Sequence, residues 1–188
     1  MNTLHRRVLG LALALAFALV AAPAFAEKMF LSSDDAKEKD EPQSFLQHYD
    51  KLAKGKDADW VYIPEGSLSK YKTASVKDFD HGKGVESRDA SRYGRDYMEQ
   101  WLEKQGFKIV KTGGEIVVDG NVFNAWEPHG AARYWGGWAA NPGVGLEVSV
   151  KAGGKVVGEV RQKSKGSTIR DAVENGLEDV AKAIAKGK

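Results

Sequence analysis

The strongest constraint on the fold of this chain lies between residues 144 and 163. Apolar side chains there occupy every second position, at Val144, Leu146, Val148 and Val150, with small or polar residues between them. A period of two predicts a strand with one buried face. The following stretch, 155–163, offers further apolar residues with the same period. The chain is therefore expected to build a sheet that is covered on one side.

Two connections between these strands are possible, and they give different registers. A two-residue turn at the intervening glycine pair places Leu146 opposite Arg161, whereas a three-residue loop places it opposite Val160. A slip of one residue moves every apolar side chain to the wrong face, so we predict the three-residue loop. This register also places Glu147 opposite Glu159 on the exposed face.

Two other segments have the 3.6-residue period of amphipathic helices. In the segment 91–105, Tyr93, Tyr97 and Trp101 lie one turn apart, and Gly106 ends the pattern. In the segment after Gly166, apolar residues recur every three or four positions from 169 to 184, behind a Ser or Thr cap. Each helix has one apolar face, which is expected to cover the sheet.

Weaker patterns predict the remaining elements. We expect strands at 71–79, 107–110 and 115–126, with Gly120 as a bend or bulge in the last of them. Residues 44–52 are expected to form a short helix, and residues 60–63 an extended piece. The fold class predicted is α+β: a two-layer sandwich of a largely antiparallel sheet with two helices on one face.

The N-terminus has the features of a secretory signal. Arg6 and Arg7 precede an apolar run, 8–20, and the small residues Ala24 and Ala26 flank Phe25 at a cleavage site. We predict cleavage after Ala26 and export to the periplasm or out of the cell. Residues 27–43 are charged and are expected to be a flexible leader, with a single domain over 44–188.

Composition narrows the partners of the exported chain. Without Arg6 and Arg7 it carries 26 basic and 26 acidic residues, so neither nucleic acid nor an anionic membrane surface is an expected partner. The chain contains no cysteine. This excludes disulfides, thiolate metal sites, thiol catalysis and a lipid attached to an N-terminal cysteine, so no stable membrane anchor is expected after cleavage.

One glycine-rich segment is the best candidate for a binding site. It contains an arginine and three aromatic residues, Arg133, Tyr134, Trp135 and Trp138. Aromatic and arginine side chains are enriched in interfaces and stack on sugars or peptides. The alternative is structural, with both tryptophans folded back over the open end of the sheet.

Other motifs are better explained as structural features than as catalytic or metal-binding sites. Ser67 to Lys70 matches S-x-x-K and Lys111 to Gly113 matches K-T-G, but the serine lies in a turn rather than at the start of a buried helix. Asp78, Asp80 and His81 are the only compact group of metal-capable residues, and a solvated strand end explains them. We therefore predict no catalytic residues, no metal and no cofactor.

The basic residues of the last predicted strand have a similar explanation. Arg161, Lys163 and Lys165 lie on alternate positions and share one face. A solvated sheet face is the expected reading, and an anionic partner is the alternative.

Several spacings resemble known families. The pattern 45–52, with Phe45, Leu46, Tyr49 and Leu52, resembles the start of uncharacterised bacterial envelope lipoproteins. A longer pattern resembles a related domain of unknown function, on the residues Trp101, Leu102, Gly106, Phe107, Gly120, Ala132, Arg133, Gly136, Gly137, Leu146, Val148, Val150, Gly154, Val156 and Gly158. These families are similar in build to the N-terminal domain of the Tol-system propeller protein. The resemblance implies an accessory or binding role and supplies no catalytic residues, and this chain lacks the lipidated cysteine.

These observations lead to one leading hypothesis and two rivals. The leading one is a non-catalytic periplasmic accessory protein that binds another envelope protein or component through residues 133–138. The second is a self-assembling structural envelope protein, a homo-oligomer. A hydrolase of cell-wall or lipid material is the third, and it lacks a coherent nucleophile or metal set.

Overall fold

The computed structural model describes residues 44–82, 85, 87–127 and 141–188. The strands are β1 (Ala53–Lys54), β2 (Trp60–Tyr62), β3 (Thr73–Val76), β4 (Asp80–His81), β5 (Lys108–Ile109), β6 (Ile116–Trp126), β7 (Gly143–Ala152) and β8 (Lys155–Lys165). Within these residues the helices are α2 (Asp89–Lys104) and α4 (Ile169–Lys186), and Tyr49–Lys51 forms a 3₁₀ turn, η1. Within these ranges no helix has both the length and the apolar composition that a membrane span requires.

The strands form one sheet, in the order β1-β2-β8-β7-β6-β3-β5, with β4 paired to β6. The central pairs β6–β7 and β7–β8 are antiparallel, as are β2–β8 and β1–β2. At the other edge β3 runs parallel to both β5 and β6, and β4 runs parallel to β6. Both edge strands, β1 and β5, are only two residues long.

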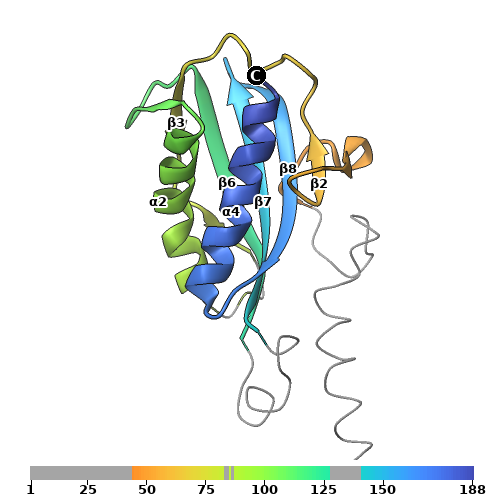
Figure 1. The fold of residues 1–188 in the computed structure, drawn as a ribbon, viewed down its shortest axis with the longest axis vertical. Helices are drawn as coiled ribbons and strands as arrows, with labels where there is room; N and C mark the ends of the chain where they lie inside the picture. Colours follow the sequence, from red (N-terminus) through yellow and green to blue (C-terminus); the bar gives the residue numbers. More distant parts are fainter. Residues whose placement is uncertain (1–43, 83–84, 86, 128–140) are drawn as a thin grey trace, which may run out of the picture. The chain divides into compact units, whose positions relative to one another are not determined.

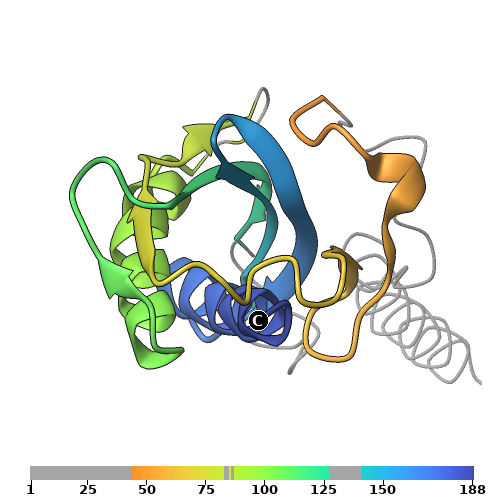
Figure 2. The ribbon, with the colours of Figure 1, turned by 90° about the horizontal axis from the view of Figure 1, so that it is seen from above.

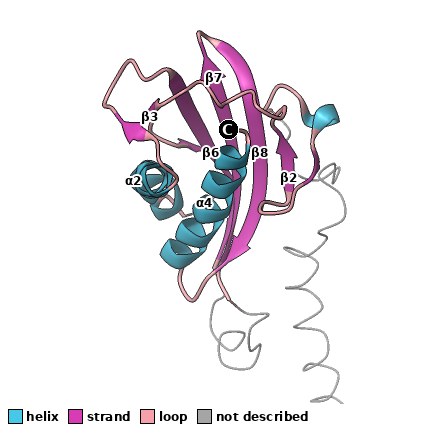
Figure 3. Ribbon diagram, turned by 45° about the horizontal axis from the view of Figure 1, so that its top comes forward, coloured by secondary structure: helices cyan, strands magenta, loops and turns pink. Residues whose placement is uncertain are grey.

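Both helices pack on the same face of this sheet (Figures 1 and 3). Viewed from above, α2 and α4 lie side by side against the concave side of the strands (Figure 2). The predicted α+β sandwich is thus confirmed, with a parallel edge that the sequence pattern did not indicate. Leu146, Val148 and Val150 are fully buried under the helices, as predicted.

The ends of both helices follow the predicted signals. The Thr168 hydroxyl accepts a hydrogen bond from the Asp171 amide and caps α4, which begins at Ile169. The helix α2 ends at Lys104, and Gly106 follows with a φ of +85°, in the left-handed region that glycine adopts readily.

The short helix predicted for residues 44–52 is wrong. Only Tyr49–Lys51 forms a 3₁₀ turn. The spacing of Phe45, Tyr49 and Leu52 imitates a helix face, but the Tyr49 hydroxyl accepts hydrogen bonds from the Phe45 and Leu46 amides, at 3.1 and 3.2 Å. A side chain therefore satisfies backbone groups here, and the segment stays irregular.

The predicted register of β7 and β8 is also wrong. The strands turn through Gly153 and Gly154, with φ of +55° and +81°, as a two-residue turn with two left-handed residues requires. A bulge between Val150 and Lys151 then shifts the pairing by one residue, so that Val148 lies opposite Val160. The bulge keeps the apolar side chains of both strands on the face that the helices cover. The predicted three-residue loop would have had the same effect.

The bulge in β6 lies elsewhere than predicted. The register of β6 against β7 shifts between Val122 and Asn124, not at Gly120. Gly120 instead faces the ring of Phe79, and a Cβ on that glycine would lie 2.3 Å from the ring. Gly94 of α2 approaches the same ring, with a hypothetical Cβ 2.4 Å away. The two glycines thus form a slot for Phe79 between helix and sheet.

Candidate functional site

The predicted binding residues Arg133, Tyr134, Trp135 and Trp138 lie outside the described residues. The strands on either side of them pair with each other: Trp126 at the end of β6 lies opposite Gly143 at the start of β7. The segment therefore connects two central strands at one end of the sheet. Its role as core or contact surface stays a prediction.

The side chains that the structure does bring together lie on the sheet face away from the helices. Two adjacent rows run across it: Asp119, Ser149, Glu159 and Tyr62 in the first, and Asn121, Glu147, Arg161 and Trp60 in the second. The first three residues of each row are buried. This contradicts the prediction of a solvated face that includes Arg161, whose exposed fraction is 1%. Lys163 and Lys165 are partly exposed.

Glu147 and Arg161 form the centre of this buried polar cluster. The corrected register places them opposite each other, and Arg161 Nη1 lies 2.5 Å from Glu147 Oε1. Glu147 also accepts hydrogen bonds from the Tyr49 hydroxyl, at 2.7 Å, and from Asn121 Nδ2, at 3.2 Å. The predicted repulsion between Glu147 and Glu159 is thus replaced by a buried ion pair.

A phenylalanine supports the guanidinium group of Arg161. The Phe123 side chain lies at the β6 bulge and extends across Gly145, where a Cβ would lie 2.4 Å from the ring. The Arg161 guanidinium carbon lies 4.0 Å from the Phe123 ring centroid, in cation–π geometry. The bulge and Gly145 therefore let an aromatic ring from β6 reach a cation on β8.

The second buried carboxylate, Glu159, binds the N-terminal segment. Its oxygens accept hydrogen bonds from the backbone amides of Gln47, at 2.6 Å, and His48, at 2.9 Å. The Nδ1 atom of His48 lies 3.0 Å from the same carboxylate. Glu159 has an exposed fraction of 0%. A buried carboxylate is tolerated when donors of this kind satisfy it.

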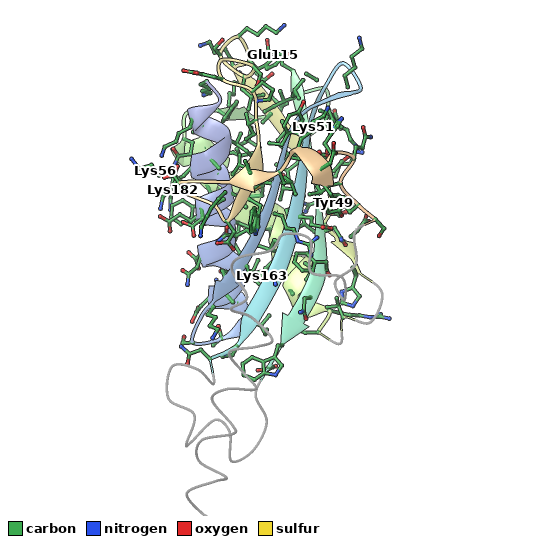
Figure 4. All side chains as sticks on the ribbon, turned by 90° about the vertical axis from the view of Figure 1, so that its right-hand side faces the viewer. Tyr49, Lys51, Lys56, Glu115, Lys163 and Lys182 are labelled. Carbon is green, nitrogen blue, oxygen red and sulfur yellow. The ribbon has the colours of Figure 1, made fainter. Side chains whose placement is uncertain are left out.

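We call residues 44–52 the strap. Figure 4 shows Tyr49 of the strap on the side of the strands away from α4, while Lys56, further along the chain, lies on the helix side. The chain thus passes around the sheet edge between these residues. On the helix side Asp57 forms an ion pair with Lys186 of α4.

Burial and hydrogen bonding fix the protonation of the Tyr49 hydroxyl. Burial raises the pKa of Tyr49 to about 12, although the amides of Leu46 and Phe45 act in the opposite direction. The carboxylate of Glu147 raises this pKa further. Tyr49 is therefore a hydrogen-bond donor to Glu147 throughout the physiological range.

Two lysines form ion pairs with Asp119, the third acidic residue on this face of the sheet. Asp119 lies 2.5 Å from Lys151 Nζ and 2.8 Å from Lys77 Nζ. Burial alone would raise the pKa of Asp119, but the two lysines outweigh it and lower the pKa below its ordinary value. The stabilisation that follows is present above the ordinary pKa of an aspartate and is lost as the pH falls through the lowered value.

The other residues singled out in the sequence do not converge on a site. Asp78 pairs with Arg95 at 2.8 Å, and Asp80 is exposed. His81 Nε2 lies 2.6 Å from the Val85 carbonyl. Over the described ranges, no three His, Asp or Glu side chains gather at a point that could hold a metal ion.

One groove in the described part of the chain lies beside α4. It has a volume of about 270 Å³ and an apolar floor that includes Val61, Ile63 and Ala183. Asp57 and Lys186, which form an ion pair, also line it. No catalytic grouping lines it.

Comparison with known proteins finds similarity in structure only. No protein-family model matches the chain, and no curated protein is significantly similar to it in sequence. The fold resembles that of PelC from Paraburkholderia phytofirmans. Two crystal structures of PelC dodecamers, one of a single-substitution variant, match 66% of this chain and 95% of the PelC chain. The TM-score is 0.52 in both cases, and the sequence identities are 17% and 16%.

This similarity concerns the fold that the family resemblance implied. The PelC match covers nearly the whole of the PelC chain, so the shared part is the complete sandwich rather than one motif. It does not single out the N-terminal domain of the Tol-system propeller protein. At this level of identity the match shows a shared fold.

Proposed function

We propose that this chain is a non-catalytic protein of the bacterial cell envelope that works as a homo-oligomer. The observation that carries the proposal is the PelC match, because PelC has the same sandwich over 95% of its chain and was crystallised as a dodecamer. The secretory pattern of residues 1–26 supports an envelope location. The non-catalytic role is supported by the buried acidic groups, because Glu147 is paired with Arg161 and Glu159 accepts hydrogen bonds from the backbone amides of Gln47 and His48.

The oligomer is tested by measuring molar mass in solution. The chain without residues 1–26 is expected to sediment as a closed assembly of several copies over a wide range of concentrations. Light scattering after size exclusion gives an independent mass. A monomer at every concentration contradicts the proposal.

The segment with Arg133, Tyr134, Trp135 and Trp138 is proposed as the surface that contacts another envelope component. The double substitution Trp135→Ala and Trp138→Ala is expected to abolish capture of partners from an envelope extract. Thermal stability is expected to stay unchanged, since contact residues contribute to binding rather than to the core.

A matched control uses the exposed turn before β6. Lys111 and Thr112 are exposed and precede β6 in the chain, whereas the segment follows β6, and alanine at both positions should leave capture intact. If the tryptophan variant unfolds at a much lower temperature than this control, the two rings belong to the core. The contact surface would then lie elsewhere.

A further inference from the structure

The strap, residues 44–52, contacts the rest of the protein mainly through polar groups. Leu46 is the one buried apolar residue among the nine, and η1 contains none. The hydrophobic core beneath the helices includes no residue of the strap. The strap therefore adds little apolar burial, which is the main source of cooperativity with a core.

The backbone of the strap pairs with no strand of the sheet, and its links to the sheet are bonds from two amides to the side chain of Glu159. The segment forms no ladder with a strand, and its internal bonds are those of η1 and of the Tyr49 hydroxyl with Phe45 and Leu46. Removing the strap would therefore break no strand pairing.

The polar contacts of the strap depend on two buried carboxylates. Among the described residues, every hydrogen bond that the Glu159 carboxylate accepts comes from Gln47 and His48. The Tyr49 hydroxyl supplies the link to Glu147. Glu147 has other partners within the sheet, Arg161 and Asn121, and so does not depend on the strap. Glu159 is the carboxylate that holds the strap closed.

We propose that residues 44–52 are a releasable strap: they open as one unit while the sheet and helices stay folded, and the charge of Glu159 sets the balance between closed and open. Opening removes the backbone donors of Gln47 and His48 from Glu159 and exposes its carboxylate to water.

The test is the substitution Glu159→Gln in the chain, followed by amide hydrogen exchange. Glutamine keeps the shape and one acceptor oxygen but loses the charge-assisted bonds to two backbone amides. Exchange at residues 45–48 is expected to accelerate about tenfold or more, with β7, β8 and α4 unchanged. Trypsin cleavage after Lys51 should accelerate in parallel.

Glu115→Gln is the matched control. Glu115 likewise accepts bonds from two consecutive amides, those of Lys72 and Thr73, at 2.7 and 2.9 Å, but it does not contact the strap. Its substitution should leave exchange at residues 45–48 as it is.

His48→Ala provides a second variant with a milder effect, since it removes the ring contact and keeps the backbone amide. It should accelerate exchange in the same residues by a smaller factor. Acceleration spread equally over the central strands, or no change at residues 45–48 in Glu159→Gln, would overturn the proposal.

Discussion

Replacing Arg161 by methionine is expected to lower the free energy of unfolding by about 3–5 kcal/mol, because it removes the guanidinium group that pairs with the buried Glu147 carboxylate. Both side chains have exposed fractions of 1%, so water cannot replace the lost partner. Tyr49 and Asn121 would still donate to Glu147, but they are neutral. Chemical denaturation followed by circular dichroism measures the loss.

Two further variants make this expectation specific. Adding Glu147→Gln to Arg161→Met removes the stranded charge and should recover a large part of the stability. Arg95→Met breaks the exposed ion pair with Asp78 and should cost less than about 1 kcal/mol. If the double variant is no more stable than Arg161→Met, the loss reflects packing of the arginine on Phe123 rather than an uncompensated charge.

Replacing Phe79 by alanine is expected to cost about 3–5 kcal/mol, because its ring fills the slot between Gly94 and Gly120. Both glycines contact the ring so closely that neither accommodates a methyl group. Gly120→Ala alone should therefore destabilise by about 1–3 kcal/mol through overpacking. Thermal denaturation of the two single variants provides the measurement.

The combination of the two changes tests the slot itself. In a protein that already carries Phe79→Ala, Gly120→Ala should be neutral or stabilising, because the new methyl group occupies part of the cavity. If Gly120→Ala lowers stability equally with and without Phe79→Ala, glycine is required at position 120 for its backbone conformation and not to make room for the Phe79 ring.

The helices and central strands could be predicted from the sequence because each has one apolar face. In α4, residues such as Val173, Leu177 and Ile184 recur at helical spacing, and all three are buried as expected. In the sheet, Val148 and Val150 belong to a row of apolar residues at every second position, which likewise predicts one buried face. Burial of an apolar face follows from period alone, without knowledge of the partner element.

The register of β7 and β8 could not be predicted in this way. The pattern required only that Val148 and Val160 share a face, and a bulge satisfies this requirement as well as a longer turn does. The decisive difference lies on the other face, where the bulge brings Arg161 opposite Glu147. Opposite charges across strands favour one register, and this signal was present in the sequence.

The buried polar cluster was missed because its cover is irregular. Residues 44–52 imitate a helix, and nothing in their pattern indicates that Tyr49 and His48 reach carboxylates about a hundred positions away. Residues with charged side chains on alternate strand positions are usually solvated. The parallel pairing of β3 with β6 was missed for a similar reason, since four residues carry too little pattern to fix a direction.

The short outermost strands limit how copies of this protein can meet. With β1 and β5 reduced to two residues each, the described sheet offers no long row of free amides and carbonyls at either border. In the proposed homo-oligomer, neighbouring subunits are then expected to join through side chains and connecting segments rather than through continued strand pairing. A subunit of such an oligomer could then leave or join without any strand pairing being broken.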